Sequence, residues 1–239
     1  MIETSHIVAI LWQQAGWVIA ALLFLGGLKL SVVPKLKGLM GEAVVRARLK
    51  GLAVDEIHDC ILPDGRGGMT QIDHLYLTGN GIRVIETKNY GGRIFGTARQ
   101  KTWTQRLGRG SIRIPNPLRQ NWGHAQAVKA LVGEGVPVHG HVVVGGRAEF
   151  PKGVPTGVQR PRELAAELRA EAAEGPPPQA WNSAWQELRA ATRSDTAARK
   201  AHRAALARKY GADKATSVGM VMVFAGVIVG VLYVLSTQG

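Results

Sequence analysis

The sequence has only one cysteine, Cys60, among its 239 residues. A single cysteine cannot form a disulfide within the chain, and it excludes zinc sites that are built on several cysteines. This cysteine usage fits a reducing compartment, where structural disulfides are rare.

Charged residues are missing from both ends of the chain. Residues 4–28 and 215–239 contain no Lys, Arg, Asp or Glu, and both stretches are apolar. About 20 apolar residues in a helix cross the hydrocarbon core of a bilayer, so we expect transmembrane helices at 5–29 and 216–236. The alternative of two core helices is disfavoured, because such helices are usually shorter and carry a polar stripe. A cleaved signal peptide would begin with positive charge, whereas Glu3 is the only charged residue of positions 1–6.

The basic residues predict the orientation of these two helices. All 30 Lys and Arg, and every acidic residue except Glu3, lie between Lys29 and Lys214. The positive-inside rule then places residues 29–214 in the cytoplasm and both termini outside, as in a multi-pass protein of the cytoplasmic membrane. Gly226 and Gly230 form a GxxxG pattern, which would pack against the first span or, as a homodimer, against a second copy of the chain.

The part between the spans alternates helical and strand-like patterns. We expect two strands, 70–78 and 82–88, joined by Gly79-Asn80-Gly81, because Asn-Gly between strand-like runs is a hairpin signal. The other expected elements are a helix at 41–52, strands at 54–62, within 93–105 and at 138–144, and helices at 116–132, 161–175 and 180–210. This order indicates an α/β protein with a mixed sheet and flanking helices. We place its main domain at 36–175 and a basic helical segment at 179–211.

The expected hairpin brings acidic residues together. With Asn80-Gly81 as a two-residue turn, Asp73 lies opposite Lys88, and Glu86 lies diagonally beside Asp73 on the same face of the sheet. Such neighbours are within roughly 5 to 8 Å of each other, close enough for two carboxylates to share a divalent ion. Taken alone, these residues also fit a plain ion pair on a solvated face.

A metal at this place would have a chemical use. A hard cation such as Mg²⁺ prefers carboxylate and water oxygens. When bound, it polarises a phosphate and lowers the pKa of a water molecule. A neighbouring lysine can orient or deprotonate that water and stabilise the negative transition state.

Several short stretches of the sequence occur in an order that resembles a known family. The stretches are Lys37-Gly38 with Gly41-Glu42, residues 70–74, Gly81-Ile82, residues 84–92, and Asn116-Pro117-Leu118 with Gln120-Asn121 and His124. Over about residues 37–145 the chain is similar to the nuclease-related domain (NERD) family, a branch of the PD-(D/E)XK nuclease superfamily. Ile72 stands where the superfamily name has proline.

The resemblance implies a fold, a site and an activity. The implied fold is a restriction-endonuclease-like αβββαβ core with a mixed sheet. Carried over residue by residue, Glu42, Asp73 and Glu86 hold Mg²⁺ or Mn²⁺, Lys88 serves the nucleophile, and Gln120 supports the site. The implied activity is hydrolysis of phosphodiester bonds in nucleic acid, with DNA favoured over RNA. The alternative is a membrane-tethered module that keeps this fold and binds nucleic acid, or signals, without turnover.

Two histidines near these residues are expected to be structural. His124 is expected to pack or cap rather than ligate a metal. His74 alternates to the face opposite Asp73, so we interpret it as a structural residue as well.

The excess of basic residues suggests a polyanionic partner. Seven of these residues lie close in sequence to the predicted site, with Trp103 and Trp122 among them: Arg93, Arg99, Lys101, Arg106, Arg109, Arg113 and Arg119. Cations next to the spans also set topology and contact anionic lipid. A structural membrane protein whose basic middle part lies on lipid is therefore a further alternative.

Overall fold

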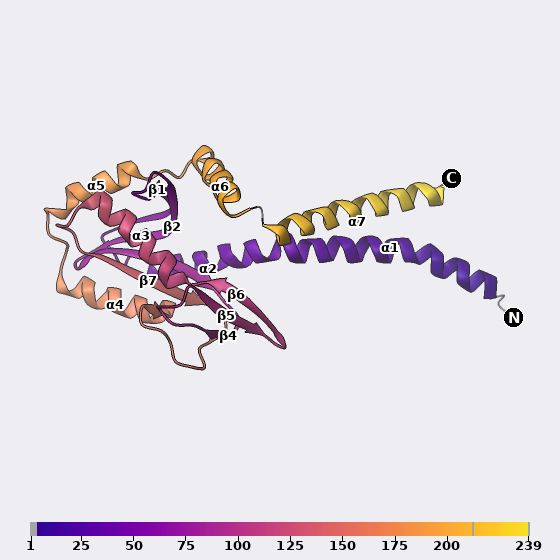
Figure 1. The fold of residues 1–239 in the computed structure, drawn as a ribbon, viewed down its shortest axis with the longest axis horizontal. Coiled ribbons are helices and arrows are strands. Elements are labelled where there is room, and N and C mark those ends of the chain that lie inside the picture. The colour runs from indigo at the N-terminus through magenta and orange to yellow at the C-terminus, as the bar shows by residue number, and fades with distance from the viewer. Residues whose placement is uncertain (1–3, 212, 239) are drawn as a thin grey trace. The chain divides into compact units, whose positions relative to one another are not determined.

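The computed structural model describes residues 4–211 and 213–238 (Figure 1). The chain divides into two compact units. One unit consists of the two ends of the chain, up to Lys37 and from Leu206 onward, and the other is Gly38–Ala205.

The first unit is a pair of long helices, α1 (Thr4–Ser31) and α7 (Lys214–Gln238). Two helices of the described chain are long and apolar enough to cross a membrane, one within 14–49 and one at Lys214–Ser236. This confirms the two expected apolar helices. The first continues after a single-residue break at Val32 into α2 (Val33–Leu49), so α2 begins earlier than the expected helix at 41–52.

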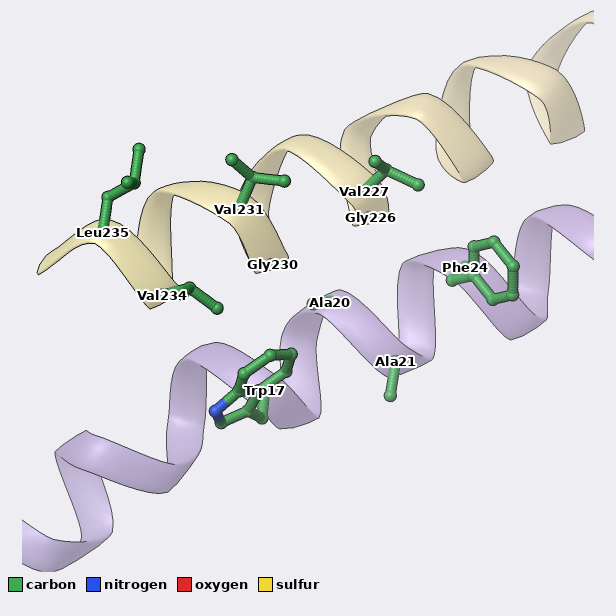
Figure 2. Close-up of a pocket in the computed structure, with 10 residues that line it drawn as sticks. All are labelled: Trp17, Ala20, Ala21, Phe24, Gly226, Val227, Gly230, Val231, Val234 and Leu235. Carbon is green, nitrogen blue, oxygen red and sulfur yellow. The ribbon is translucent and has the colours of Figure 1, made fainter. Parts of the chain in front are cut away.

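Small residues allow α1 and α7 to pack closely. A Cβ atom added to Gly27 would lie 2.5 Å from the carbonyl oxygen of Gly219, and one added to Gly226 would lie 2.8 Å from that of Ala20. Since Gly27 faces Gly219 while Ala20 faces Gly226, the two helices run antiparallel. Figure 2 shows Gly226 on the side of α7 that faces α1. The GxxxG pattern therefore packs against the first apolar helix of the same chain.

An apolar groove of about 550 Å³ lies between these two helices. Its walls include Trp17 and Phe24 of α1 and Val227, Val231 and Leu235 of α7 (Figure 2). A homodimer through α7 stays a prediction.

The second unit is built on a five-stranded mixed sheet in the order β1-β2-β3-β7-β9. The strands are β1 (Asp55–Pro63), β2 (Met69–Thr78), β3 (Gly81–Asn89), β7 (Val138–Gly145) and β9 (Val158–Gln159). The pairs β1/β2 and β2/β3 are antiparallel, whereas β3/β7 and β7/β9 are parallel. With α3 (Pro117–Val132) before β7, the chain order α2, β1, β2, β3, α3, β7 confirms the expected αβββαβ core in a mixed α/β fold.

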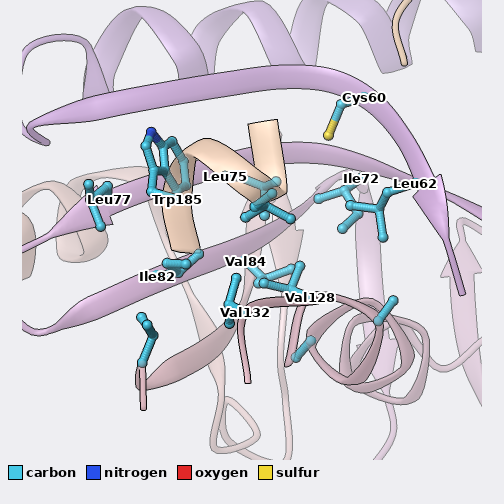
Figure 3. Packing of buried hydrophobic residues seen from close by; sticks show 14 residues of the cluster. Cys60, Leu62, Ile72, Leu75, Leu77, Ile82, Val84, Val128, Val132 and Trp185 are labelled. Carbon is cyan, nitrogen blue, oxygen red and sulfur yellow. The ribbon is translucent and has the colours of Figure 1, made fainter. Parts of the chain in front are cut away.

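Helices cover both faces of this sheet. On one face, a core cluster joins β-strand residues such as Leu75 and Val84 to Val128 of α3 and Trp185 of α5 (Trp181–Ala191), as Figure 3 shows. On the other face, Tyr76 and Ile85 pack with Val45 and Leu49 of α2 and with Leu164 and Leu168 of α4 (Pro161–Glu174).

A smaller sheet, in the order β6-β5-β4-β8, is inserted mainly between β3 and α3. Its strands are β4 (Gly92–Phe95), β5 (Thr102–Leu107), β6 (Gly110–Pro115) and β8 (Ala148–Glu149). Short strands within 93–105 were expected, but β6 was not. Ile94 and Trp103 fix this sheet by packing against Val142 and Val144 of β7.

The register of the β2–β3 hairpin differs from the expected one. Thr78 pairs with Gly81, so the two-residue turn is Gly79-Asn80 and not Asn80-Gly81. The Thr78 hydroxyl donates to the carbonyl of Gly81 (3.0 Å) and accepts from the N–H of Asn80 (3.3 Å), which closes the turn one residue earlier. Continued beyond the paired residues, this register places Asp73 across from Glu86 instead of Lys88. Because the shift preserves parity, the three side chains remain on one face.

The expected helix over 180–210 is divided into α5 and α6 (Thr196–Tyr210). Arg193, between them, exchanges two backbone hydrogen bonds of 2.8 Å with Ile61 on the edge strand β1. These two bonds satisfy the backbone N–H and C=O of Arg193, in a segment whose local sequence would also allow a helix.

Candidate active site

Three predicted residues converge on adjacent strands of the main sheet. The Nζ atom of Lys88 lies 2.5 Å from Oε1 of Glu86. The two residues are two positions apart on β3, so their side chains lie on the same face of the sheet. Asp73 on β2 accepts a hydrogen bond of 2.7 Å at Oδ2 from the backbone N–H of Thr87. The hairpin therefore brings the two carboxylates and the amine together.

The third predicted acid, Glu42, lies on α2 near the end of β3. A Cβ atom added to the preceding residue, Gly41, would lie only 2.8 Å from Cβ of Asn89, so the helix approaches the strand closely at this glycine. After burial, which is the main cause in both cases, the charge of Glu42 adds to the raised pKa of Asp73, and the charge of Glu86 adds to that of Glu42. Glu42 therefore belongs to the same electrostatic environment as the two strand acids.

Burial and crowded negative charge act differently on these acids. Burial, followed by the charge of Glu86, raises the pKa of Asp73 to about 8. Burial also raises the pKa of Glu42. For Glu86, burial opposes ionisation, but the hydrogen bond from His124 and the charge of Lys88 outweigh it and lower the pKa. The site thus holds more acidic groups than it can easily ionise at once, as is typical of functional sites.

His124 contacts Glu86, although only packing or capping was expected of it. Its Nε2 atom lies 3.2 Å from Oε2 of Glu86, and its Nδ1 atom shares a hydrogen bond of 2.8 Å with Oγ1 of Thr70. His124 therefore orients the carboxylate of Glu86. The available signal was the helical spacing of Asn121, His124, Ala125 and Val128, all of which are buried on one side of α3.

Asparagines hold α3 in place beside the site. Asn116 caps the helix by accepting from the N–H of Leu118 at 2.9 Å. The side chain of Asn121 is buried and donates to the carbonyl of Val84 on β3, at 3.1 Å. The predicted site residue Gln120 lies between them, one turn before His124, with an exposed side chain.

The donors of the site suit a hard divalent cation. In the described part of the chain, no group of three or more His, Cys, Asp or Glu side chains is arranged to hold a metal ion as it stands. Both oxygens of Glu86 are engaged, Oε1 by Lys88 and Oε2 by His124. All three candidate ligands, however, are carboxylates, which Mg²⁺ and Mn²⁺ prefer. Burial is the main cause of the raised pKa of Asp73, and the charges of Glu86 and Glu42 add to it; a cation bound here would offset those charges.

His74 lies in a separate cluster. Its Nδ1 atom is 2.9 Å from Nδ1 of His58, and its ring packs edge-on against that of His58. Burial lowers the pKa of His74 to about 3, so this ring is neutral at physiological pH. The two residues are paired across β1 and β2, on the face of the sheet opposite Asp73.

Part of the chain is similar to known proteins. Residues 37–145 match the model of the nuclease-related domain, which confirms the resemblance found in the sequence. An uncharacterised protein of Bacillus anthracis is 35% identical over 122 residues, which cover 50% of this chain and 58% of that relative. No solved structure matches the chain significantly. The segment that carries Glu42, Asp73, Glu86, Lys88 and His124 therefore lies within the residues that match the nuclease-related domain.

Proposed function

We propose that the chain is a membrane-anchored, divalent-metal-dependent nuclease that hydrolyses phosphodiester bonds of nucleic acid, with DNA as the favoured substrate. The observation that carries this proposal is the convergence of Asp73, Glu86 and Lys88 on one face of the β2–β3 hairpin. The match of this segment to the nuclease-related domain supports it. Since the chain spans 58% of its relative's length, the activity of the whole protein is part of the proposal.

The acids and the lysine have distinct roles in this proposal. Glu42, Asp73 and Glu86 would hold Mg²⁺ or Mn²⁺, which supplies Lewis acidity toward the phosphate and lowers the pKa of a bound water. The N–H of Thr87 fixes Asp73, and His124 fixes Glu86, so the two strand carboxylates keep their orientation.

Lys88 acts as a cation. Burial alone would lower its pKa, but the charge of Glu86 outweighs burial and raises it. The amine is therefore protonated at neutral pH, where it orients the attacking water and stabilises the charge that develops on the phosphate. Gln120 is exposed one turn before His124 and would contact the substrate rather than the ion.

The direct test is the metal requirement for cleavage. We expect the full chain, in detergent or nanodiscs, to cleave DNA with Mg²⁺ or Mn²⁺, and cleavage to stop with EDTA and return with excess Mg²⁺. RNA of the same sequence, assayed in parallel, measures the substrate preference. Cleavage that continues unchanged in EDTA would contradict metal dependence.

One observation favours a second candidate, a nucleic-acid-binding or signalling module without turnover. Both Glu86 oxygens already have partners within the protein, so this carboxylate is satisfied without an ion. Salt-dependent binding of nucleic acid, with no hydrolysis in Mg²⁺, Mn²⁺, Ca²⁺ or Zn²⁺, would select this candidate over the nuclease.

The antiparallel helix pair supports a proposed membrane arrangement. Because α1 and α7 pack antiparallel, the end of α1 and the start of α7 lie at the same end of the pair, and Lys29, Lys35 and Lys214 are all near that end. The positive-inside rule places this end, and the domain between the helices, in the cytoplasm.

Cysteine labelling tests this topology. Cys60 is buried and gives a low background, so single cysteines can be introduced by Lys152→Cys in the domain and Ser236→Cys at the end of α7. An impermeant maleimide added to intact cells is expected to label Ser236→Cys, and Lys152→Cys only after the membrane is opened. Labelling of Lys152→Cys in intact cells would reverse the assigned sides.

A further inference from the structure

One face of the smaller sheet presents arginines from three neighbouring strands. Arg93 of β4 pairs with Arg106 of β5, and Thr104 of β5 pairs with Arg113 of β6. Directly paired residues, and those two apart on one strand, point to the same side of a sheet. Arg93, Arg106 and Arg113 therefore share one face, here called the arginine face, and all three are exposed.

The other face of this sheet is the one that packs on the protein. Ile94 and Trp103, which alternate with the arginine-face positions, are each 1% exposed and contact the core around Val142. The arginine face must therefore point outward, to solvent or to a partner.

The positive charge of this face has little internal compensation. The sequence contains no Asp or Glu between Glu86 and Glu134. Arg93 meets Glu149 at 3.7 Å, but the two side chains are 64% and 69% exposed, so this pair contributes little. In the part of the chain that the structure describes, neither Arg106 nor Arg113 forms an ion pair. Because like charges directly opposite on neighbouring strands are destabilising, the array costs stability unless an anion neutralises it.

The side chains on this face fit the phosphates of a nucleic acid better than a lipid surface. Arginine binds phosphate oxygens with two parallel hydrogen bonds, and Thr104 and Ser111 add hydroxyl donors among the arginines. Phe95, opposite Thr104, adds a half-buried aromatic ring. A membrane-surface element instead pairs its cations with large apolar side chains. The exposed Leu107 and Ile112 of this hairpin alternate to the opposite face.

The arginine face is also close to the candidate active site along the chain. Arg93 is five positions after Lys88, so their Cα atoms are at most about 18 Å apart. Gln105 of β5 donates a hydrogen bond of 2.8 Å to the carbonyl of Gly91, which ties the smaller sheet to the segment that follows β3. A nucleic acid bound on this face would reach the acids within a few nucleotides.

We infer that the arginine face binds the sugar-phosphate backbone of the nucleic acid and delivers it to the site at Asp73, Glu86 and Lys88. This inference rests on the proposed function, because it names the surface that holds the substrate of that activity. Binding through phosphates is independent of base sequence and weakens as salt rises.

The test is oligonucleotide binding by the full chain in nanodiscs of neutral lipid. Every protein carries Lys88→Ala and is kept in EDTA, so that binding is measured without cleavage. Arg93→Gln, Arg106→Gln and Arg113→Gln, introduced together, are expected to weaken the affinity for labelled DNA about 10- to 100-fold at moderate salt, and to reduce the slope of log affinity against log salt by about 3.

The matched control replaces three exposed arginines elsewhere in the domain: Arg66→Gln, Arg162→Gln and Arg169→Gln. It changes the net charge equally and is expected to retain nearly full affinity. Unfolding curves of both triple variants verify the fold, and the arginine-face variant should be at least as stable as the parent because like charges are removed.

Three results would overturn the inference. The first is equal loss of affinity in the two triple variants, and the second is no loss in either. The third is oligonucleotide binding that survives in the arginine-face variant while binding of phosphatidylserine vesicles is lost, since this would assign the face to lipid. If the face binds DNA but the protein with Lys88 intact never cleaves it, the inference stands and the proposed nuclease activity fails.

Discussion

Asp73→Asn and Lys88→Ala are each expected to reduce metal-dependent cleavage by about 10²- to 10³-fold. The first change removes a negative ligand but keeps an oxygen that can accept from the N–H of Thr87, so the local geometry is preserved. The second removes the cation that lies 2.5 Å from Glu86. The measurement is the single-turnover rate on DNA at saturating Mg²⁺, with Glu134→Gln and Lys152→Ala as exposed acidic and basic controls.

The partner of Glu86 should give an intermediate result in the same series. His124→Ala leaves all three acids in place but frees one oxygen of Glu86, and loss of such an orienting residue typically costs about 10- to 100-fold. Normal rates in both Asp73→Asn and Lys88→Ala would reject the assignment of the site. A large loss in the controls would show that the assay reports on something other than this site.

The same Asp73→Asn change is expected to stabilise the fold at alkaline pH. The pKa of Asp73 is raised to about 8 in the folded state from an ordinary value of 3.8, so between these values the folded protein holds a proton that the unfolded chain releases. Asp73 therefore contributes stability that is full below about pH 4 and is lost as the pH rises through about 8. Above that pH, Asp73→Asn should be more stable than the parent by a few kcal/mol.

Unfolding by denaturant between pH 5 and pH 9 measures this effect. The parent's free energy of unfolding should fall across this range, and that of Asp73→Asn should fall less. Mg²⁺ should stabilise the parent at pH 8.5 and leave Asp73→Asn nearly unchanged, because a ligand stabilises only the state that binds it. Identical pH dependence in the two proteins would mean that Asp73 ionises normally. Glu86 does not contribute to the fall in the free energy of unfolding between pH 5 and pH 9. Its pKa is lowered, so the stability that it contributes is lost only as the pH falls through the acid range.

Much of this domain could be predicted from local patterns. Asn116-Pro117 marks the start of α3 because an Asn cap followed by proline is strongly favoured at a helix N-terminus, and α3 does begin at Pro117. The common face of Asp73, Glu86 and Lys88 was predicted although the hairpin register was wrong, because a shift that preserves parity leaves every side chain on its own face.

The features that were missed depend on contacts between distant parts of the chain. His124 and Glu86 meet because buried Asn121 fixes α3 on β3; the helical spacing of Asn121 and His124 indicates a shared face of the helix, but not that this face lies beside Glu86. The break between α5 and α6 comes from the pairing of Arg193 with Ile61 on an edge strand. Strand β6 is short and mostly exposed, so it lacks the regular alternation of apolar and polar residues that identifies a half-buried strand.

The most direct measurement is anomalous diffraction from crystals of the full chain loaded with Mn²⁺. The proposal predicts a single strong peak between the carboxylates of Asp73 and Glu86, within coordination distance of Glu42, and no peak in crystals of Asp73→Asn. Crystals that show no manganese there, at a concentration at which the protein cleaves DNA, would contradict the claim that these three acids hold the ion.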